Sequence, residues 1–140
     1  MAPRKTTTTG PGTRLNRNYT VTFGLVAGTA GAQRIVFGAK GWVKGWMGAA
    51  NTTPDNVDWT LRRSHNANFP IDDIAALARN LVGNGQRPFW LPKSEWLRVR
   101  DGSSINVQVL NLTAGVQRID VTAIVSEDSL QPEPDQGEDR

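Results

Sequence analysis

Few residues in this chain are of types that could do chemistry. His65 is the only histidine among the 140 residues, and cysteine is absent. Histidine catalysis needs an orienting acid and a nucleophile close by, and no spacing around His65 in RRSHNANF suggests either. Asp72 and Asp73 are adjacent acids, whereas calcium loops alternate their ligands; at the start of a helix such acids usually complement its positive end. The residues therefore predict a protein that is not an enzyme and holds no metal or cofactor.

The five tryptophans indicate contact chemistry instead. In GWVKGWMG an extended chain places Trp42, Lys44 and Trp46 on one face, and such a face can stack bases or sugars or anchor a protein partner. The alternative is that one or both indoles fill the core. A second group shares a strand face further along, with Leu97 and Val99 pointing inward; its members, which we also treat as surface or interface candidates, are Trp96, Arg98 and Arg100.

Two nearly identical stretches show which elements position these residues. TAGAQRIVFGA at 29–39 and TAGVQRIDVTA at 113–123 agree at seven of eleven positions. Each follows a run in which apolar and polar residues alternate, the signature of a half-buried strand; the apolar positions are Val21, Phe23 and Leu25 in one run and Ile105, Val107 and Val109 in the other. Each copy therefore predicts a strand, a small-residue turn and a returning strand, and hence two similar hairpins.

Other signals complete the expected fold. Asp101-Gly102 predicts a tight hairpin between EWLRVR and SINVQVLNL. Residues 71–82 repeat apolar positions at helical spacing, with Pro70 before them and Gly83 after. We therefore expect a mainly β fold, an antiparallel two-sheet sandwich of about eight strands with one helix at 71–82. A jelly roll is one such arrangement, and a partly open barrel is the competing architecture.

Charge divides the chain into three parts. An extended basic arm is expected at 1–17, the sandwich at 18–126, and an acidic tail at 127–140 that carries six acids against Arg140. The arm has no acid, and we expect its bases to bind partners; they are Arg4, Lys5, Arg14 and Arg17. Four charges neutralise few phosphates, so binding to nucleic acid is expected to be weak and salt-sensitive. No apolar run is long enough for a membrane span, and the N-terminus lacks the apolar region of a secretion signal.

The stretch LPKSEWLRVRDGSSINVQVLNLTAGVQRIDVTAIVSED carries a resemblance. An apolar-proline entry, a strand, an Asp-Gly turn and two alternating strands follow one another. This order resembles small β-sandwich accessory proteins of bacteriophage virions, over roughly residues 88–126. The resemblance implies a non-enzymatic structural role in the virion, as a decoration, cement, neck or spike-base protein. It also implies binding to other virion proteins such as the major capsid protein, and homo-oligomers.

Two other functions remain open from the sequence. One is a carbohydrate- or ligand-binding β-module, which would use Trp42 and Trp46 as a pair of exposed, coplanar rings. The other is a small jelly-roll coat protein that contacts nucleic acid through its basic arm.

Overall fold

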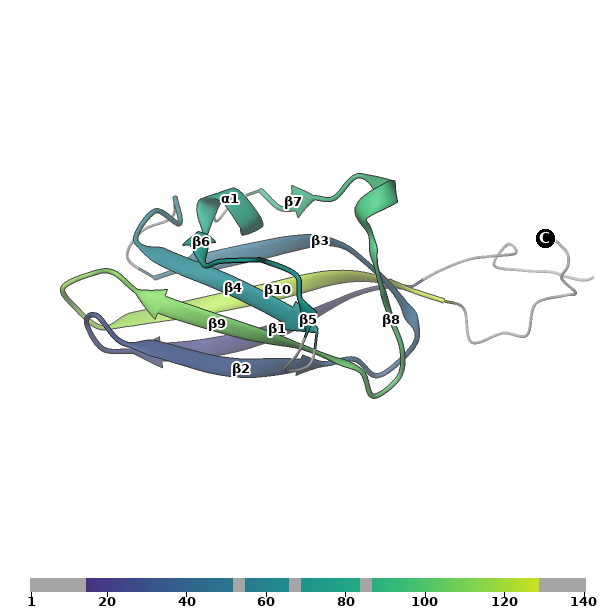
Figure 1. Ribbon diagram of the computed structural model, residues 1–140, viewed down its shortest axis with the longest axis horizontal. Coiled ribbons are helices and arrows are strands. Elements are labelled where there is room, and N and C mark those ends of the chain that lie inside the picture. The colour runs from purple at the N-terminus through teal and green to yellow at the C-terminus, as the bar shows by residue number, and fades with distance from the viewer. Residues whose placement is uncertain (1–14, 52–54, 66–68, 84–86, 129–140) are drawn as a thin grey trace, which may run out of the picture.

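The computed structural model describes residues 15–51, 55–65, 69–83 and 87–128, which form two antiparallel sheets packed face to face (Figure 1). Sheet A contains β1 (Leu15–Leu25), β10 (Gln117–Glu127), β3 (Gly41–Ala50), β7 (Phe89–Trp90) and β8 (Leu97–Val99). Sheet B contains β2 (Ala30–Val36), β9 (Ser104–Asn111), β4 (Trp59–His65), β5 (Phe69–Pro70) and β6 (Ala76–Leu77). The other elements are α1 (Arg79–Val82) and a 3-10 helix, η2 (Lys93–Glu95).

The strand pairs are nested. β1 pairs with β10, β2 with β9, β3 with β7 and β8, and β4 with β5 and β6, while β10–β3 and β9–β4 join these pairs into sheets. This order, in which the first strand meets the last and the second meets the next to last, is that of a jelly roll. The predicted sandwich is therefore confirmed. No described strand pairs with strands of both sheets, so the sheets do not close into the alternative barrel.

The two similar stretches are turns, but they do not form hairpins. β1 belongs to sheet A and β2 to sheet B, and β9 and β10 are likewise in different sheets. Each turn is therefore an arch that carries the chain across the sandwich. The same correction applies to Asp101-Gly102: Gly102 has the expected positive φ of 84°, but β8 before it lies in sheet A and β9 after it in sheet B. Small turn residues serve both kinds of connection, which is why the sequence alone suggested hairpins.

The helix predicted over 71–82 is wrong in extent. Only α1 is helical, and the residues before it run along the edge of β4. The backbone N–H groups of Ile71 and Asp72 donate to the carbonyl of Arg63, and β6 pairs with β4 at Leu61 and Thr60. Pairing along this edge covers backbone N–H and C=O groups of β4 that would otherwise form an open sheet edge. No helix among the described residues is long and apolar enough to cross a membrane.

The core lies between the sheets and receives side chains from both. The largest fully buried residues are Trp46, Trp59, Phe37, Leu61, Ile105 and Ile119. Val82, the buried residue of α1, packs into the same cluster. Alternation along the long strands places most of these apolar groups inward, as the sequence pattern predicted for Ile105.

The ordered body is longer at both ends than the sequence indicated. β1 begins at Leu15, so Arg17, which was expected in the loose arm, is a strand residue paired with Val125. Glu127, expected in the acidic tail, ends β10 and is 3% exposed. The sandwich therefore extends beyond the predicted boundaries at 18 and 126.

Candidate partner-binding surfaces

A β-bulge separates the three residues expected on one face of β3. Opposite the step from Ile124 to Val125 on β10, β3 advances by two residues, from Gly45 to Val43. Lys44 is the additional residue. A bulge shifts the alternation of side chains by one position, so Trp42 and Lys44 lie on the outer face, whereas Trp46 points into the core and is 0% exposed. The expectation of a shared exposed face is wrong for Trp46, and Trp42 and Trp46 cannot form a paired platform for a sugar.

Trp42 forms a stack at the end of sheet A. The guanidinium of Arg98, on the neighbouring strand β8, lies 5.1 Å from the centre of the Trp42 ring. Arg98 also donates to the Gly41 carbonyl at 3.3 Å and pairs with Asp128 at 3.0 Å. Cation–π contact and the ion pair together hold both side chains in place, so this part of the predicted surface is ordered and partly occupied by its own contacts.

Lys44, Trp96 and Arg100 lie nearby but apart from that stack. Lys44 donates to the Asn16 side chain at 2.8 Å, and its ammonium lies 5.8 Å from the ring centre of the exposed Trp90. Trp96 donates its indole N–H to the Leu91 carbonyl at 3.0 Å. Arg100 is exposed. As predicted, Val99 points inward. These candidates therefore mark the β7–β8 edge of sheet A.

An ion pair inside the sandwich was not foreseen from the sequence. Arg63 of β4 is 6% exposed and faces inward between apolar neighbours. It binds Asp72 through Nε and Nη2, both at 2.9 Å, and its guanidinium lies 4.7 Å from the ring centre of Trp46. Asp72 was expected to complement a helix terminus, and that expectation is wrong. The only signal in the sequence was the alternation along β4, which places Arg63 at an inward position between apolar residues.

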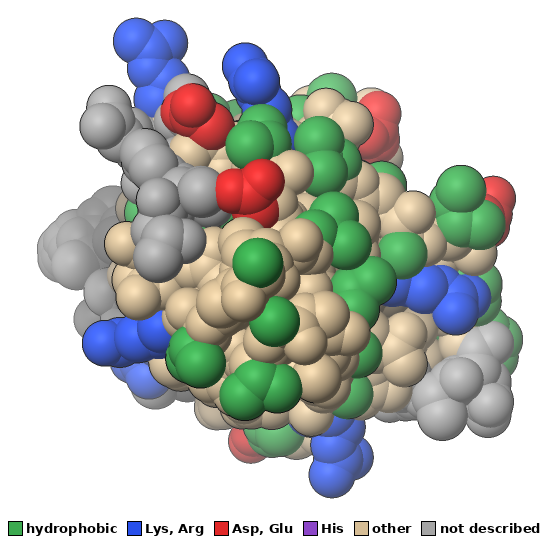
Figure 2. Space-filling view, turned by 90° about the vertical axis from the view of Figure 1, so that its left-hand side faces the viewer, with side chains coloured by type: hydrophobic (Ala, Val, Ile, Leu, Met, Phe, Trp, Pro, Cys, Tyr) green, Lys and Arg blue, Asp and Glu red, His purple; other side chains and the backbone are tan. Residues whose placement is uncertain are grey.

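The end of the sandwich where the two arches cross is apolar. The turn at 26–29 and the turn at 112–116 lie against each other, and the segment before β4 joins them, since the Leu112 N–H donates to the Asp58 carbonyl at 2.9 Å. Aliphatic side chains on these turns remain in solvent: Val26 is 57%, Val57 38%, Leu112 52% and Val116 68% exposed. Figure 2 looks onto this end, where hydrophobic side chains lie across the surface and most charged ones at its margin. We call these four residues the arch end.

Asn111 holds the arch end together. It is fully buried, and its amide nitrogen donates to the carbonyls of Leu25, Val26 and Gly115 at 2.9–3.1 Å. Its side-chain oxygen accepts from both the backbone N–H and the hydroxyl of Thr113. One amide thus connects both turns, and the exposed aliphatic groups stand on a rigid support.

At the opposite end of the sandwich β1 begins and β10 ends. Arg17 lies 3.3 Å from the Glu127 carboxylate, which also accepts a hydrogen bond from the Tyr19 hydroxyl. Burial and this hydrogen bond, in that order, raise the pKa of Tyr19. The predicted arm residues Arg4, Lys5 and Arg14 lie outside the described residues.

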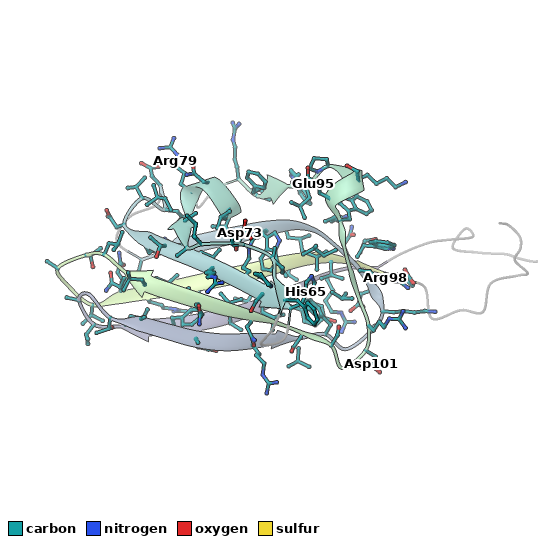
Figure 3. All side chains as sticks on the ribbon, viewed as in Figure 1. His65, Asp73, Arg79, Glu95, Arg98 and Asp101 are labelled. Carbon is teal, nitrogen blue, oxygen red and sulfur yellow. The ribbon has the colours of Figure 1, made fainter. Side chains whose placement is uncertain are left out.

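The described side chains form no catalytic grouping around His65. It ends β4, beside Phe69 of β5, and Figure 3 shows Asp73, Glu95 and Asp101 spread over separate parts of the molecule. Within the described residues, no group of three or more His, Cys, Asp or Glu side chains could hold a metal ion.

Fold and surface together define a jelly-roll β-sandwich protein with exposed aliphatic side chains at one end and, at the other, the charged residues Arg17, Glu127 and Asp128. No protein-family model matches the chain, and no curated protein sequence matches it.

Proposed function

We propose that this chain is a non-enzymatic structural protein of a virion, which joins other protein subunits through the arch end. The class of protein, a virion structural protein, is taken from the bacteriophage accessory proteins that residues 88–126 resemble. The observation that carries the binding role is the exposure of four aliphatic side chains at the arch end, whose two turns are held by Asn111. Large apolar side chains gathered at one exposed surface are typical of protein-interaction sites.

The arch end suits a protein partner better than a sugar or nucleic acid. Its exposed side chains are aliphatic, so they offer neither aromatic rings for stacking nor cations for phosphates. A preorganised support lowers the entropy lost on association. The arch end therefore contributes to the affinity for a protein partner through burial of its hydrophobic side chains.

The arrangement of the ends supports assembly. β1 and β10 run the full length of sheet A, from the termini to the arches, over about 36 Å for eleven residues. Contacts at the arch end and at the termini therefore do not compete for the same space. One subunit can engage two neighbours, and we propose that the arm (Arg4, Lys5 and Arg14) provides the second attachment and that the protein forms homo-oligomers.

The test compares two double variants of the full chain. Leu112→Ser with Val116→Ser removes apolar surface from the arch end, whereas Val36→Ser with Phe69→Ser removes similarly exposed groups elsewhere. We expect sedimentation velocity to show concentration-dependent association of the wild type and the control, and its loss in the arch-end variant. A wild type that stays monomeric up to its solubility limit, or equal loss in both variants, contradicts the arch-end role.

The virion assignment has its own test. Mass spectrometry of purified virus particles should detect the chain at a stoichiometric ratio to the major capsid protein. Its absence from particles that form normally in its presence contradicts the assignment, without affecting the result at the arch end.

A further inference from the structure

The outer face of sheet B carries a polar hollow of about 670 Å³. Its centre is built by two cross-strand rows, one of Arg34, Asn106 and Ser64 and one of Ala32, Gln108 and Arg62. Gln33 and Pro70 complete the lining. The lining thus contains two guanidinium groups and several amides but no carboxylate.

The cations of this hollow have little to neutralise them. Arg62 donates from Nε to the Asp72 carbonyl at 3.3 Å, while the Asp72 carboxylate is bound to Arg63 on the other side of β4. The side chains of Arg34 and Gln108 form no hydrogen bond or ion pair with another residue in the described part of the chain. These groups are therefore available as donors to an anion.

The hollow continues into a groove. A second one of about 410 Å³ shares Ala32, Arg62 and Gln108 with the first and extends to Ala75 and Leu110. An elongated groove across a sheet fits an extended ligand better than a compact one.

The chemistry favours an acidic peptide over other anions. No aromatic side chain lines either hollow, so neither bases nor sugar rings have a surface on which to stack. Two cations also neutralise too few phosphates for more than weak nucleic-acid binding. Two guanidinium groups match two carboxylates one to one, each through paired hydrogen bonds.

The chain itself carries such a peptide. Beyond Asp128, the last described residue, the sequence has four acids within seven positions and few apolar residues among them. The acids are Glu133, Asp135, Glu138 and Asp139. Pro132 and Pro134 in QPEPD disfavour helix at the residues before them, which suits an extended ligand.

The tail starts close enough to reach the groove. The Asp128 N–H donates to the Lys40 carbonyl at 2.9 Å, and Lys40 is six residues from Arg34 along the chain. Six residues span at most about 20 Å, and Asp135, seven residues beyond Asp128, can reach about 23 Å at the extended rise per residue. Figure 1 shows β10 leaving the sandwich at the end to which β2 runs. A tethered peptide also acts at an effective concentration in the millimolar range.

We propose that residues 133–139 of the same chain bind along this groove, with their carboxylates paired to Arg34 and Arg62. This contact is independent of the arch end. It would shield the basic face of sheet B until a more strongly acidic partner displaces the tail.

The experiment uses ¹⁵N-labelled full-length protein. A tail-neutral variant combines Glu133→Gln, Asp135→Asn, Glu138→Gln and Asp139→Asn. We expect NMR shifts in this variant at the Nε groups of Arg34 and Arg62 and at the Gln108 side-chain amide. They should be independent of protein concentration and reproduced by adding salt to the wild type. A peptide of residues 129–140 should bind the tail-neutral variant, with affinity about tenfold lower after Arg34→Gln and Arg62→Gln.

The matched control places Arg79→Gln and Arg100→Gln, two exposed arginines outside the groove, in the tail-neutral variant and should leave peptide affinity unchanged. Equal loss of affinity in both arginine pairs, or unchanged groove resonances in the tail-neutral variant, overturns the proposal. Shifts that grow with protein concentration assign the groove to the tail of a second copy and overturn the same-chain contact. If a short single-stranded DNA saturates the groove at a lower concentration than the peptide does, the assignment of an acidic peptide as the ligand is overturned.

Discussion

The Arg63 guanidinium is bound at two points by the Asp72 carboxylate and packs against the Trp46 indole, 4.7 Å from its ring centre. These residues come from β4, the segment after β5, and β3 of the opposite sheet. The contact of Arg63 with Trp46 therefore links the two sheets, and the ion pair of Arg63 with Asp72 fastens residues 71–75 along the open edge of sheet B. Asp72 also accepts from the Arg63 backbone N–H at 2.8 Å, which anchors the same segment.

Replacing Asp72 should be costly for stability. Asp72→Asn keeps the shape but leaves the Arg63 charge buried without a counterion, and loss of one partner of a buried pair costs about 3–5 kcal/mol. Asp73→Asn, at an exposed neighbouring position, should change the free energy of unfolding by less than about 0.5 kcal/mol. Urea denaturation of both variants measures the difference, and equal midpoints would show that Arg63 is accommodated without Asp72.

Asn111 should be the residue on which the arch end depends most. Asn111→Ala removes the side-chain amide that donates to the buried Leu25 carbonyl and connects the two turns, and a buried unsatisfied polar group costs about 1–3 kcal/mol. Asn18→Ala, on the exposed surface of β1, is the matched substitution. Hydrogen exchange should rise at 26–29 and 112–116 in the first variant only. Unchanged protection there would mean that strand pairing alone orders the arches.

Gly48 should tolerate no side chain. It faces inward on β3, and a Cβ atom there would overlap Cγ2 of Val82 and come within 3.0 Å of the Trp59 ring. Overpacking of a filled core costs about 1–3 kcal/mol, so Gly48→Ala should lower the thermal midpoint. Gly24→Ala is the control, since nothing lies within 4 Å of its added Cβ. A Gly48→Ala protein as stable as Gly24→Ala would show that α1 can move away from β3.

Tyr19 should make stability decline in alkaline solution. Burial and its hydrogen bond to Glu127 raise the pKa of Tyr19 in the folded state, whereas the unfolded value is about 10. Between these two pKa values the folded state holds more protons than the unfolded state, so the free energy of unfolding falls as pH rises. The contribution of Tyr19 to stability is complete below its pKa in the unfolded state and is lost as pH rises through its pKa in the folded state. Denaturation from pH 8 to about 11 measures the free energy of unfolding of the wild type and of Tyr19→Phe. A parallel decline of both with pH would contradict the prediction.

The predicted strands were mostly correct because burial imposes alternation on each strand separately. Phe23, Leu25, Ile105, Val107 and Val109 are all buried at the positions that the pattern indicated. Which strands lie side by side was not predictable in this way. The turn residues before β2, β9 and β10 allow a hairpin or an arch, and only the packing of both sheets decides between them.

The candidate surface was predicted in part. Trp42, Arg98 and Arg100 reach solvent or the sheet edge, whereas Trp46 does not. The glycines of GWVKGWMG suggest bulges or close backbone contacts, but the position of the bulge at Lys44 depends on how β3 is paired with β10. Arg63, Asp72 and the exposed aliphatic groups of the arch end were missed because their roles depend on partners from distant segments.

The amino-acid sequence by itself determined that this chain is built of strands with one apolar face each, because alternation and turn residues are local properties. It also showed opposite charge at the two termini. The tertiary structure alone decided the nested strand order, the inward turn of Trp46, the short helix and the apolar arch end. These depend on contacts between residues far apart in the chain, such as Leu25 with Asn111 and Arg63 with Trp46, and their free energy exists only once the two sheets have packed.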